Sequence, residues 1–115
     1  MLKRGNRLSS DFEFNVTRKY GKYVHGKYFH MYFLKPKNYE GPTKVGIVVS
    51  NKFSKKATER NRIKRIFREI VKENLNKIGR ENLWVVIHPK ISCQDKSYEE
   101  ISAEFNKVLQ ETPIS

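Results

Sequence analysis

The chain has 115 residues, with 24 lysine or arginine residues against 12 aspartate or glutamate residues, and a formal net charge of +12 at neutral pH. This length fits one domain, residues 1–115, and the absence of both an apolar run of about 18 residues and a secretory signal predicts a cytoplasmic protein without a membrane partner. A single cysteine, Cys93, excludes an intramolecular disulfide, and the three scattered histidines lack metal-ligand spacing, so no metal site is expected in the chain.

A short helix over residues 11–20 is the first predicted element. Ser10 and Glu13 have the spacing of a capping box, and Gly21 supplies a stop at the C-terminal end. An aromatic-rich stripe on this helix, which faces the core or lines a groove, consists of Phe12, Val16 and Tyr20.

Residues 23–35 alternate in the manner of a strand that Gly26 interrupts. The face expected in the core carries Phe29, Met31 and Phe33. The opposite face carries Tyr28, His30 and Tyr32. Amphipathic aromatic residues on that second face suit stacking on unpaired bases as well as a half-exposed sheet.

Residues 44–50 form a nearly continuous apolar run, which predicts a strand that is buried on both faces and central in the sheet. A long helix from residue 56 or 57 to residue 78 separates it from a second apolar strand over residues 83–87. Two such strands joined by a helix form a βαβ unit, which favours parallel pairing and a right-handed crossover. An amphipathic helix over residues 98–109, which we interpret as structural, ends the chain.

The long central helix carries the strongest functional signal. Residues 1–72 hold 19 basic and 5 acidic groups, and nine of the basic ones lie between Lys52 and Lys72. A row of like charges weakens an isolated helix by roughly 0.2 to 0.5 kcal/mol per pair, so we expect an anionic partner to compensate. A merely solvated face usually mixes both signs, whereas this segment sets only Glu59 and Glu69 against its nine basic residues. The pattern therefore favours binding to a polyanion such as nucleic acid.

The run from Lys55 to Arg68, which contains Arg60-Asn61-Arg62, resembles the signature of the protein subunit of bacterial ribonuclease P. Arginine and asparagine suit phosphate and base-edge contacts. The resemblance covers nearly the whole chain: residues 3–12 resemble the family's opening, residues 45–52 its third strand, and residues 84–90 and 98–109 its last strand and helix. Two features depart from the family pattern, because His88-Pro89 stands where an arginine is common and the first helix looks one residue longer.

This resemblance implies an α/β fold, an α+β sandwich with a small mixed four-stranded sheet, three helices and a left-handed βαβ crossover, against the usual rule. It also implies a ribonucleoprotein endoribonuclease whose catalytic centre lies in the partner, ribonuclease P RNA. Magnesium, held mainly by that RNA, would cut precursor tRNA to release its 5′ leader. The resemblance implies neither a catalytic residue in this chain nor a small-molecule substrate.

Carried over onto this sequence, the residues that bind the catalytic RNA are Arg60, Asn61, Arg62, Lys64, Arg65 and Arg68. The residues of a leader-binding cleft between the first helix and the sheet are Phe12, Val16, Tyr32 and Lys52. This cleft agrees with the alternation described above, because unpaired bases bind by stacking and electrostatics more than by sequence readout.

Three alternatives stay open. A ribosomal or other stable RNA-binding protein would have the same composition and βαβ core, and the Arg-Asn-Arg block together with aromatic residues on the first helix and strand speaks against it. A DNA-binding module needs a short partner helix ahead of its recognition helix, where a buried strand is predicted instead. A self-sufficient metal-dependent nuclease needs a cluster of carboxylates, which the sequence lacks.

Overall fold

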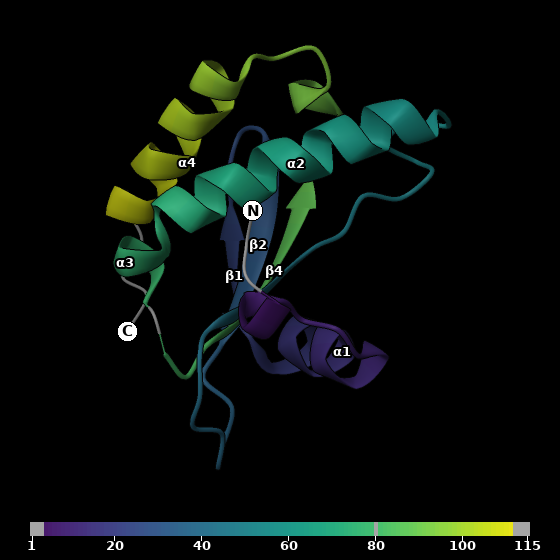
Figure 1. Cartoon of the computed structure of the whole chain (residues 1–115). Coiled ribbons are helices and arrows are strands. Elements are labelled where there is room, and N and C mark those ends of the chain that lie inside the picture. Colours follow the sequence, from purple (N-terminus) through teal and green to yellow (C-terminus); the bar gives the residue numbers. More distant parts are fainter. Residues whose placement is uncertain (1–3, 80, 112–115) are drawn as a thin grey trace.

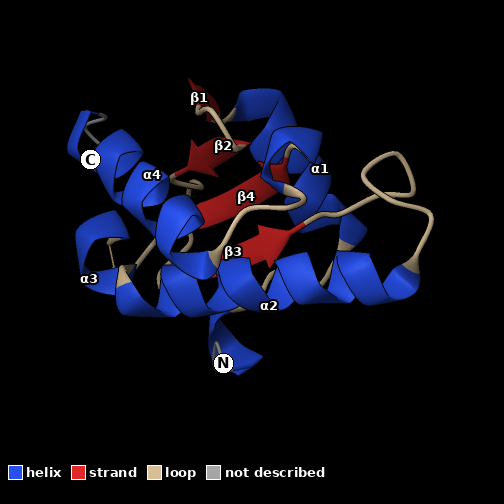
Figure 2. Cartoon of the chain, turned by 90° about the horizontal axis from the view of Figure 1, so that it is seen from above, coloured by secondary structure: helices blue, strands red, loops and turns tan. Residues whose placement is uncertain are grey.

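The computed structural model describes residues 4–79 and 81–111, which form four strands and four α-helices in three layers (Figure 1). The first half contains a 3₁₀ turn (Arg4–Asn6), α1 (Asp11–Tyr20), β1 (Lys22–His25), β2 (Phe29–Leu34) and β3 (Lys44–Ile47). The second half contains α2 (Ala57–Glu73), α3 (Leu75–Ile78), β4 (Trp84–Pro89), a 3₁₀ turn (Ile91–Cys93) and α4 (Tyr98–Glu111). Figure 2 shows the sheet between α1 on one side and α2 on the other. No helix within the described ranges is long and apolar enough to cross a membrane.

The strands follow the order β1-β2-β4-β3 across the sheet. Strands β3 and β4 are parallel, and the other neighbouring pairs are antiparallel. The mixed four-stranded sheet and the parallel pairing across α2 confirm the predicted fold class. The left-handed sense of the crossover stays a prediction. The predicted central position of β3 is wrong, because β4 is central and β3 lies at the edge.

Strand β3 is apolar because both of its faces are packed and its edge is covered. Val45 enters the main core, and Phe14 of α1 packs over Gly46, where an added Cβ would lie 2.2 Å from the Phe14 ring. The outer edge is covered by the N-terminal segment, since the Leu8 N–H donates to the Val45 carbonyl at 3.2 Å. Covering an edge in this way removes a site of unwanted strand pairing.

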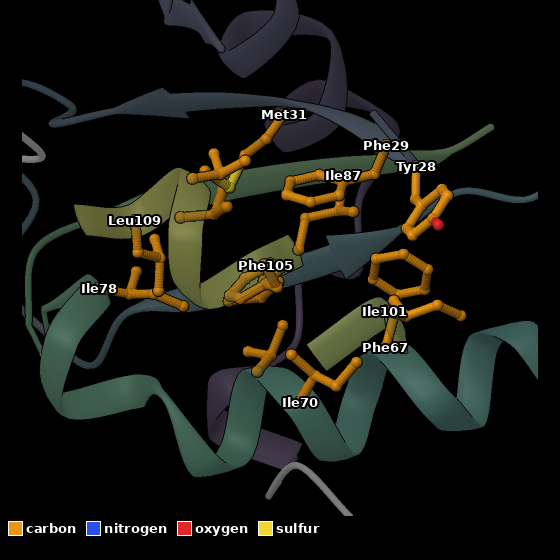
Figure 3. Packing of buried hydrophobic residues seen from close by; sticks show 14 of the residues in the cluster. Tyr28, Phe29, Met31, Phe67, Ile70, Ile78, Ile87, Ile101, Phe105 and Leu109 are labelled. Atoms are coloured by element: carbon orange, nitrogen blue, oxygen red, sulfur yellow. The ribbon is translucent and has the colours of Figure 1, made fainter. Parts of the chain in front are cut away.

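The main core lies between the sheet and helices α2, α3 and α4 (Figure 3). At its centre, the Phe29 ring centroid lies 5.8 Å from that of Phe67 and 5.1 Å from that of Phe105. Met31 and Phe33, on the same face of β2, are also buried. The predicted core face of this strand is therefore confirmed.

Tyr28 differs from its predicted place beside His30 and Tyr32. Its side chain is only 7% exposed and belongs to the main core. The strand alternation does not extend to residue 28, because the chain bends just before β2. There the Tyr28 N–H donates to the Glu104 carboxylate of α4 at 3.1 Å, and the Tyr28 carbonyl accepts from the Lys90 N–H at 2.8 Å.

The long helix predicted to end at residue 78 is divided into α2 and α3 at Asn74. The buried side-chain amide of Asn74 donates to the Ile70 carbonyl at 2.8 Å, and its backbone N–H donates to the carbonyls of Ile70 and Val71. Helix α3 ends at Gly79, whose φ of +120° favours glycine. The last strand and last helix occur where the sequence predicts them, and each extends two residues beyond the predicted end.

Helix α1 begins at the predicted capping box and is tied to β3 by the same glutamate. The Glu13 N–H donates to the Ser10 hydroxyl, and one Glu13 carboxylate oxygen accepts from the Ser9 and Ser10 amides. The other oxygen pairs with Lys44 Nζ at 2.9 Å. Burial raises the pKa of Glu13, but the Lys44 ammonium and the two amides more than offset this, so the net pKa lies below its usual value.

Replacing Glu13 by glutamine is expected to lower the free energy of unfolding by about 1 to 2 kcal/mol near pH 7, because the ion pair and the charged cap are lost at nearly constant volume. A lowered folded-state pKa gives stability that is present above the unfolded-state pKa and is lost as pH falls through the folded-state value. Urea unfolding near pH 7 and near pH 3 would measure this, with Glu40→Gln in an exposed loop as the control. If the difference in free energy of unfolding between wild type and Glu13→Gln were the same near pH 3 as near pH 7, the ionic role of Glu13 would be contradicted.

Candidate nucleic-acid interface

The predicted RNA-binding residues all lie on α2, and none of their side chains is buried. The apolar side of the helix fixes their direction, because Ile63, Phe67 and Ile70 are inserted in the main core. The outward side therefore presents cations along the length of the helix. The predicted set, which the fold places on one continuous surface here called the basic face, is Arg60, Asn61, Arg62, Lys64, Arg65 and Arg68.

Two of these arginines are engaged by the protein itself. Arg60 donates to the Ser54 carbonyl at 2.8 Å, and Arg62 donates to the carbonyls of Gln94 and Lys96 at 3.3 and 3.0 Å. These bonds fix the first turns of α2 to the loop before it and to the loop that precedes α4. Each guanidinium has five N–H donors, so both side chains retain donors for phosphate oxygens.

Glu59 adds to this anchoring, and sequence reasoning did not single it out. Its carboxylate accepts from the Gln94 side-chain amide at 2.5 Å and from the Ser54 hydroxyl at 3.1 Å. These two hydrogen bonds lower the pKa of Glu59. Gln94 lies far from Glu59 in the sequence, so no local pattern could have indicated this contact.

A second surface is the part of the sheet that α1 leaves uncovered. Cross-strand register brings together side chains from three strands, here called the open aromatic face: Tyr23 of β1, His30 and Tyr32 of β2, and His88 of β4. The Tyr32 ring centroid lies 5.2 Å from Tyr23, 5.9 Å from His30 and 6.0 Å from His88. Tyr32 is half-buried and Tyr23 is 53% exposed, so both rings are accessible for stacking.

The predicted leader-binding residues are divided between two flanks of α1. Phe12 and Val16 line an apolar groove of about 510 Å³, and the described residues that line it do not include Tyr32. The opposite flank of α1 carries Phe14, which packs over Gly46 on the same face of the sheet as Tyr32. A strand of RNA that contacts Phe12 and Tyr32 together must therefore cross α1.

Lys52 lies exposed in the loop that follows β3. The Val48 N–H donates to the Ile87 carbonyl at 2.9 Å, so the chain leaves the sheet at the end of β4 where His88 lies. From there it leads to the start of α2. Lys52 thus lies on the segment that connects the open aromatic face to the basic face.

The described residues are equipped for binding more than for acid–base or nucleophilic chemistry. Burial raises the pKa of the Cys93 thiol to about 11, so the thiol is protonated and unreactive at neutral pH. Cys93 is completely buried. Within residues 4–79 and 81–111, no group of three or more His, Cys, Asp or Glu side chains is placed to hold a metal ion.

Comparison with known proteins assigns the chain to a family. A sequence model described as Ribonuclease P matches residues 2–113. The chain belongs to the ribonuclease P protein family. As a ribonuclease P protein component, it is part of a ribonucleoprotein endonuclease of tRNA processing, and the predicted family is confirmed.

Individual relatives agree with this assignment over most of their length. The chain is 31% identical over 108 residues to the ribonuclease P protein component of Clostridioides difficile, covering 94% of this chain and 92% of the relative. It is 35% identical over 97 residues to the ribonuclease P protein component of Finegoldia magna, covering 84% and 81%. The fold matches the Staphylococcus aureus RNase P protein with a TM-score of 0.82 at 24% identity, covering 96% of this chain and 98% of that chain.

Proposed function

We propose that the protein binds ribonuclease P RNA through the basic face and holds the 5′ leader of precursor tRNA on the open aromatic face, in the cytoplasm. The arrangement that supports this most strongly is the position of Lys52 on the segment between the two surfaces. A single RNA assembly can contact both surfaces without a change in the fold. Cations position the phosphate backbone, while exposed rings accept unpaired bases.

The leader contacts that we propose differ in kind from the contacts to the catalytic RNA. Tyr32 offers a half-buried ring whose orientation is fixed by its neighbours, and Lys52 offers an exposed ammonium. Phe12 and Val16 provide a second, apolar contact on the other flank of α1. A leader long enough to cross the helix would use all four residues, whereas a short one would use Tyr32 and Lys52.

Magnesium enters this proposal through the RNA partner. Hydrated magnesium ions bound mainly by ribonuclease P RNA would activate the attacking water and stabilise the leaving oxygen. The protein's own contribution is to hold the leader and to neutralise phosphates, which favours the assembly when magnesium is scarce.

The test of leader binding is Tyr32→Ala in the reconstituted holoenzyme. Loss of a stacking ring should weaken binding of precursor tRNA by roughly 1 to 3 kcal/mol, while affinity for mature tRNA should not change. Thermal stability should fall only modestly, because the main core lies on the other face of β2. Equilibrium binding of both substrates by gel shift or fluorescence would measure the difference.

Two further variants sharpen this test. Tyr32→Phe keeps the ring and should keep most of the leader affinity. Phe12→Ala should weaken long leaders more than short ones if the leader crosses α1. Equal loss for precursor and mature tRNA in Tyr32→Ala, or a loss that follows unfolding, would make Tyr32 a packing residue and place the leader elsewhere.

A further inference from the structure

We propose that the stacked imidazoles of His30 and His88 form a proton-linked phosphate subsite on the open aromatic face, where binding of a phosphodiester of an unpaired strand is coupled to uptake of one proton. This inference rests on the proposed leader binding and adds to it a chemical mechanism that lysine and arginine cannot supply. Neither histidine belongs to the predicted leader-binding set. Their pairing depends on the register between two strands that lie far apart in the sequence.

The geometry of the pair is the first support. His30 and His88 are direct cross-strand neighbours, with ring centroids 4.9 Å apart and ring planes inclined by only 18°. The Nε2 atom of His88 is buried and has no hydrogen-bond partner among the described residues. Buried polar atoms are nearly always paired in folded proteins, so this ring has a hydrogen-bonding capacity that the described residues leave unused.

The charges around the pair are the second support. Three basic residues act electrostatically on the two rings: Arg18 of α1, Lys90 just after β4 and His25 of β1. The remaining neighbours are neutral: Tyr23 of β1 and Tyr32 of β2 contact the rings, and Val48 after β3 is apolar. None of the described groups that act on the two histidines is a carboxylate. The surroundings therefore suit an anion and oppose a positive charge on either ring.

These surroundings keep the free pair neutral. Burial lowers the pKa of His88 to about 4, and His30 and Arg18 act in the same direction. Burial lowers the pKa of His30 as well, followed by Lys90 and His25. Two stacked rings cannot both be charged at low cost, because like charges at this separation repel.

A bound phosphodiester reverses this balance. An opposite charge within about 4 to 6 Å favours the protonated imidazole, so one ring gains a proton when the phosphate binds. By linkage, the affinity for the phosphate then rises as pH falls toward the pKa of the bound complex. Arg18 and Lys90 add to the attraction for the phosphate.

The experiment compares holoenzyme affinity for precursor and mature tRNA between pH 5.5 and 8 at constant ionic strength. The ratio of the two affinities should rise about fivefold from pH 7.5 to 6.0 in the wild type. His30→Gln and His88→Gln each leave one ring, so each should reduce this dependence, and the double glutamine variant should remove it. His88→Arg should bind the leader with a ratio that no longer changes with pH. His25→Gln tests the third histidine, which is exposed on the neighbouring strand and is the last of the three influences on His30, so this variant should keep most of the wild-type dependence.

A measurement on the wild type alone guards against variants that fail to fold. Calorimetric titration of the holoenzyme with precursor tRNA, in two buffers of different ionisation enthalpy, gives the number of protons taken up. Near pH 6.5, binding of precursor tRNA should be accompanied by the uptake of about half a proton to one proton more than binding of mature tRNA.

The outcomes separate this inference from the proposed function. A precursor preference that does not change with pH, with no excess proton uptake, overturns the histidine subsite and leaves leader binding intact. No precursor preference at any pH overturns leader binding itself. A pH dependence that is lost in His25→Gln but kept in the other two glutamine variants assigns the proton to His25 and overturns the inference.

Discussion

The affinity of the protein for ribonuclease P RNA is expected to fall roughly 10²- to 10⁴-fold between about 50 and 200 mM monovalent salt. About five to eight phosphate contacts imply a log–log slope of about −4 to −7, because each neutralised phosphate releases condensed counterions. The basic face supplies five cations, and further exposed lysines lie beside it at Lys52, Lys55, Lys56 and Lys72. A fluorescence or filter-binding titration across this salt range would measure the slope.

Single substitutions measure how much each residue contributes to this slope. Arg65→Ala should reduce its magnitude by about 1 with the fold intact, since Arg65 is exposed and its Nε contacts a carbonyl of its own helix at 3.5 Å. Arg62→Ala should in addition lower stability, because it removes the bonds to the Gln94 and Lys96 carbonyls. Lys107→Ala, on the exposed side of α4, is the matched control and should leave the slope unchanged. If the affinity of the wild type for the RNA did not change with salt, the basic face would be a solvated surface that makes no phosphate contacts.

Local patterns in the sequence predicted most of the elements correctly. The capping box at Ser10 and Glu13 places the start of α1, and the alternation of Phe29, Met31 and Phe33 identifies the core face of β2. These features depend on residues a few positions apart, so a linear sequence records them. The basic face was predictable for the same reason, because a single helix carries all of it.

The predictions that failed depend on contacts distant in the sequence. An apolar strand looks the same whether it is central or an edge strand covered by another segment, as β3 is by Leu8. Tyr28 does not follow the strand alternation because its backbone N–H donates a hydrogen bond to the Glu104 carboxylate of α4. No local pattern near either residue indicates these partners.

The candidate leader site shows the same limit. The sequence places Phe12 on a stripe of α1, but only the docked helix reveals that Phe14 is on the flank that shares a face with Tyr32. Likewise, His30 and His88 become neighbours only through the register of β2 against β4. The aromatic and basic character of these surfaces was thus predictable from the sequence, whereas the residues that lie together on them required the fold, and leader binding itself stays a prediction.

The polypeptide alone is expected to leave precursor tRNA intact, while the same protein added to ribonuclease P RNA should raise cleavage at low magnesium. Hydrolysis needs a metal-bound hydroxide or an acid–base pair. His30 and His88 are the described residues closest to such a pair, but both have lowered pKa values. The two rings are also stacked, with centroids 4.9 Å apart, so they approach a phosphodiester from one side and cannot act as the base and the acid on its opposite sides, as in-line cleavage requires.

Time courses with protein alone, RNA alone and both together, at about 2 mM and 20 mM magnesium, would measure this dependence. The nature of the ends discriminates further, since cleavage by histidines through the 2′-hydroxyl leaves a 2′,3′-cyclic phosphate and magnesium-assisted hydrolysis does not. A double variant, His30→Gln with His88→Gln, should bind the leader more weakly and should still produce the same ends as the wild type, because the chemistry lies in the RNA. RNA-free, site-specific cleavage that a single carboxylate substitution abolishes would instead place the catalytic centre in the protein, and would overturn the assignment of chemistry to the RNA.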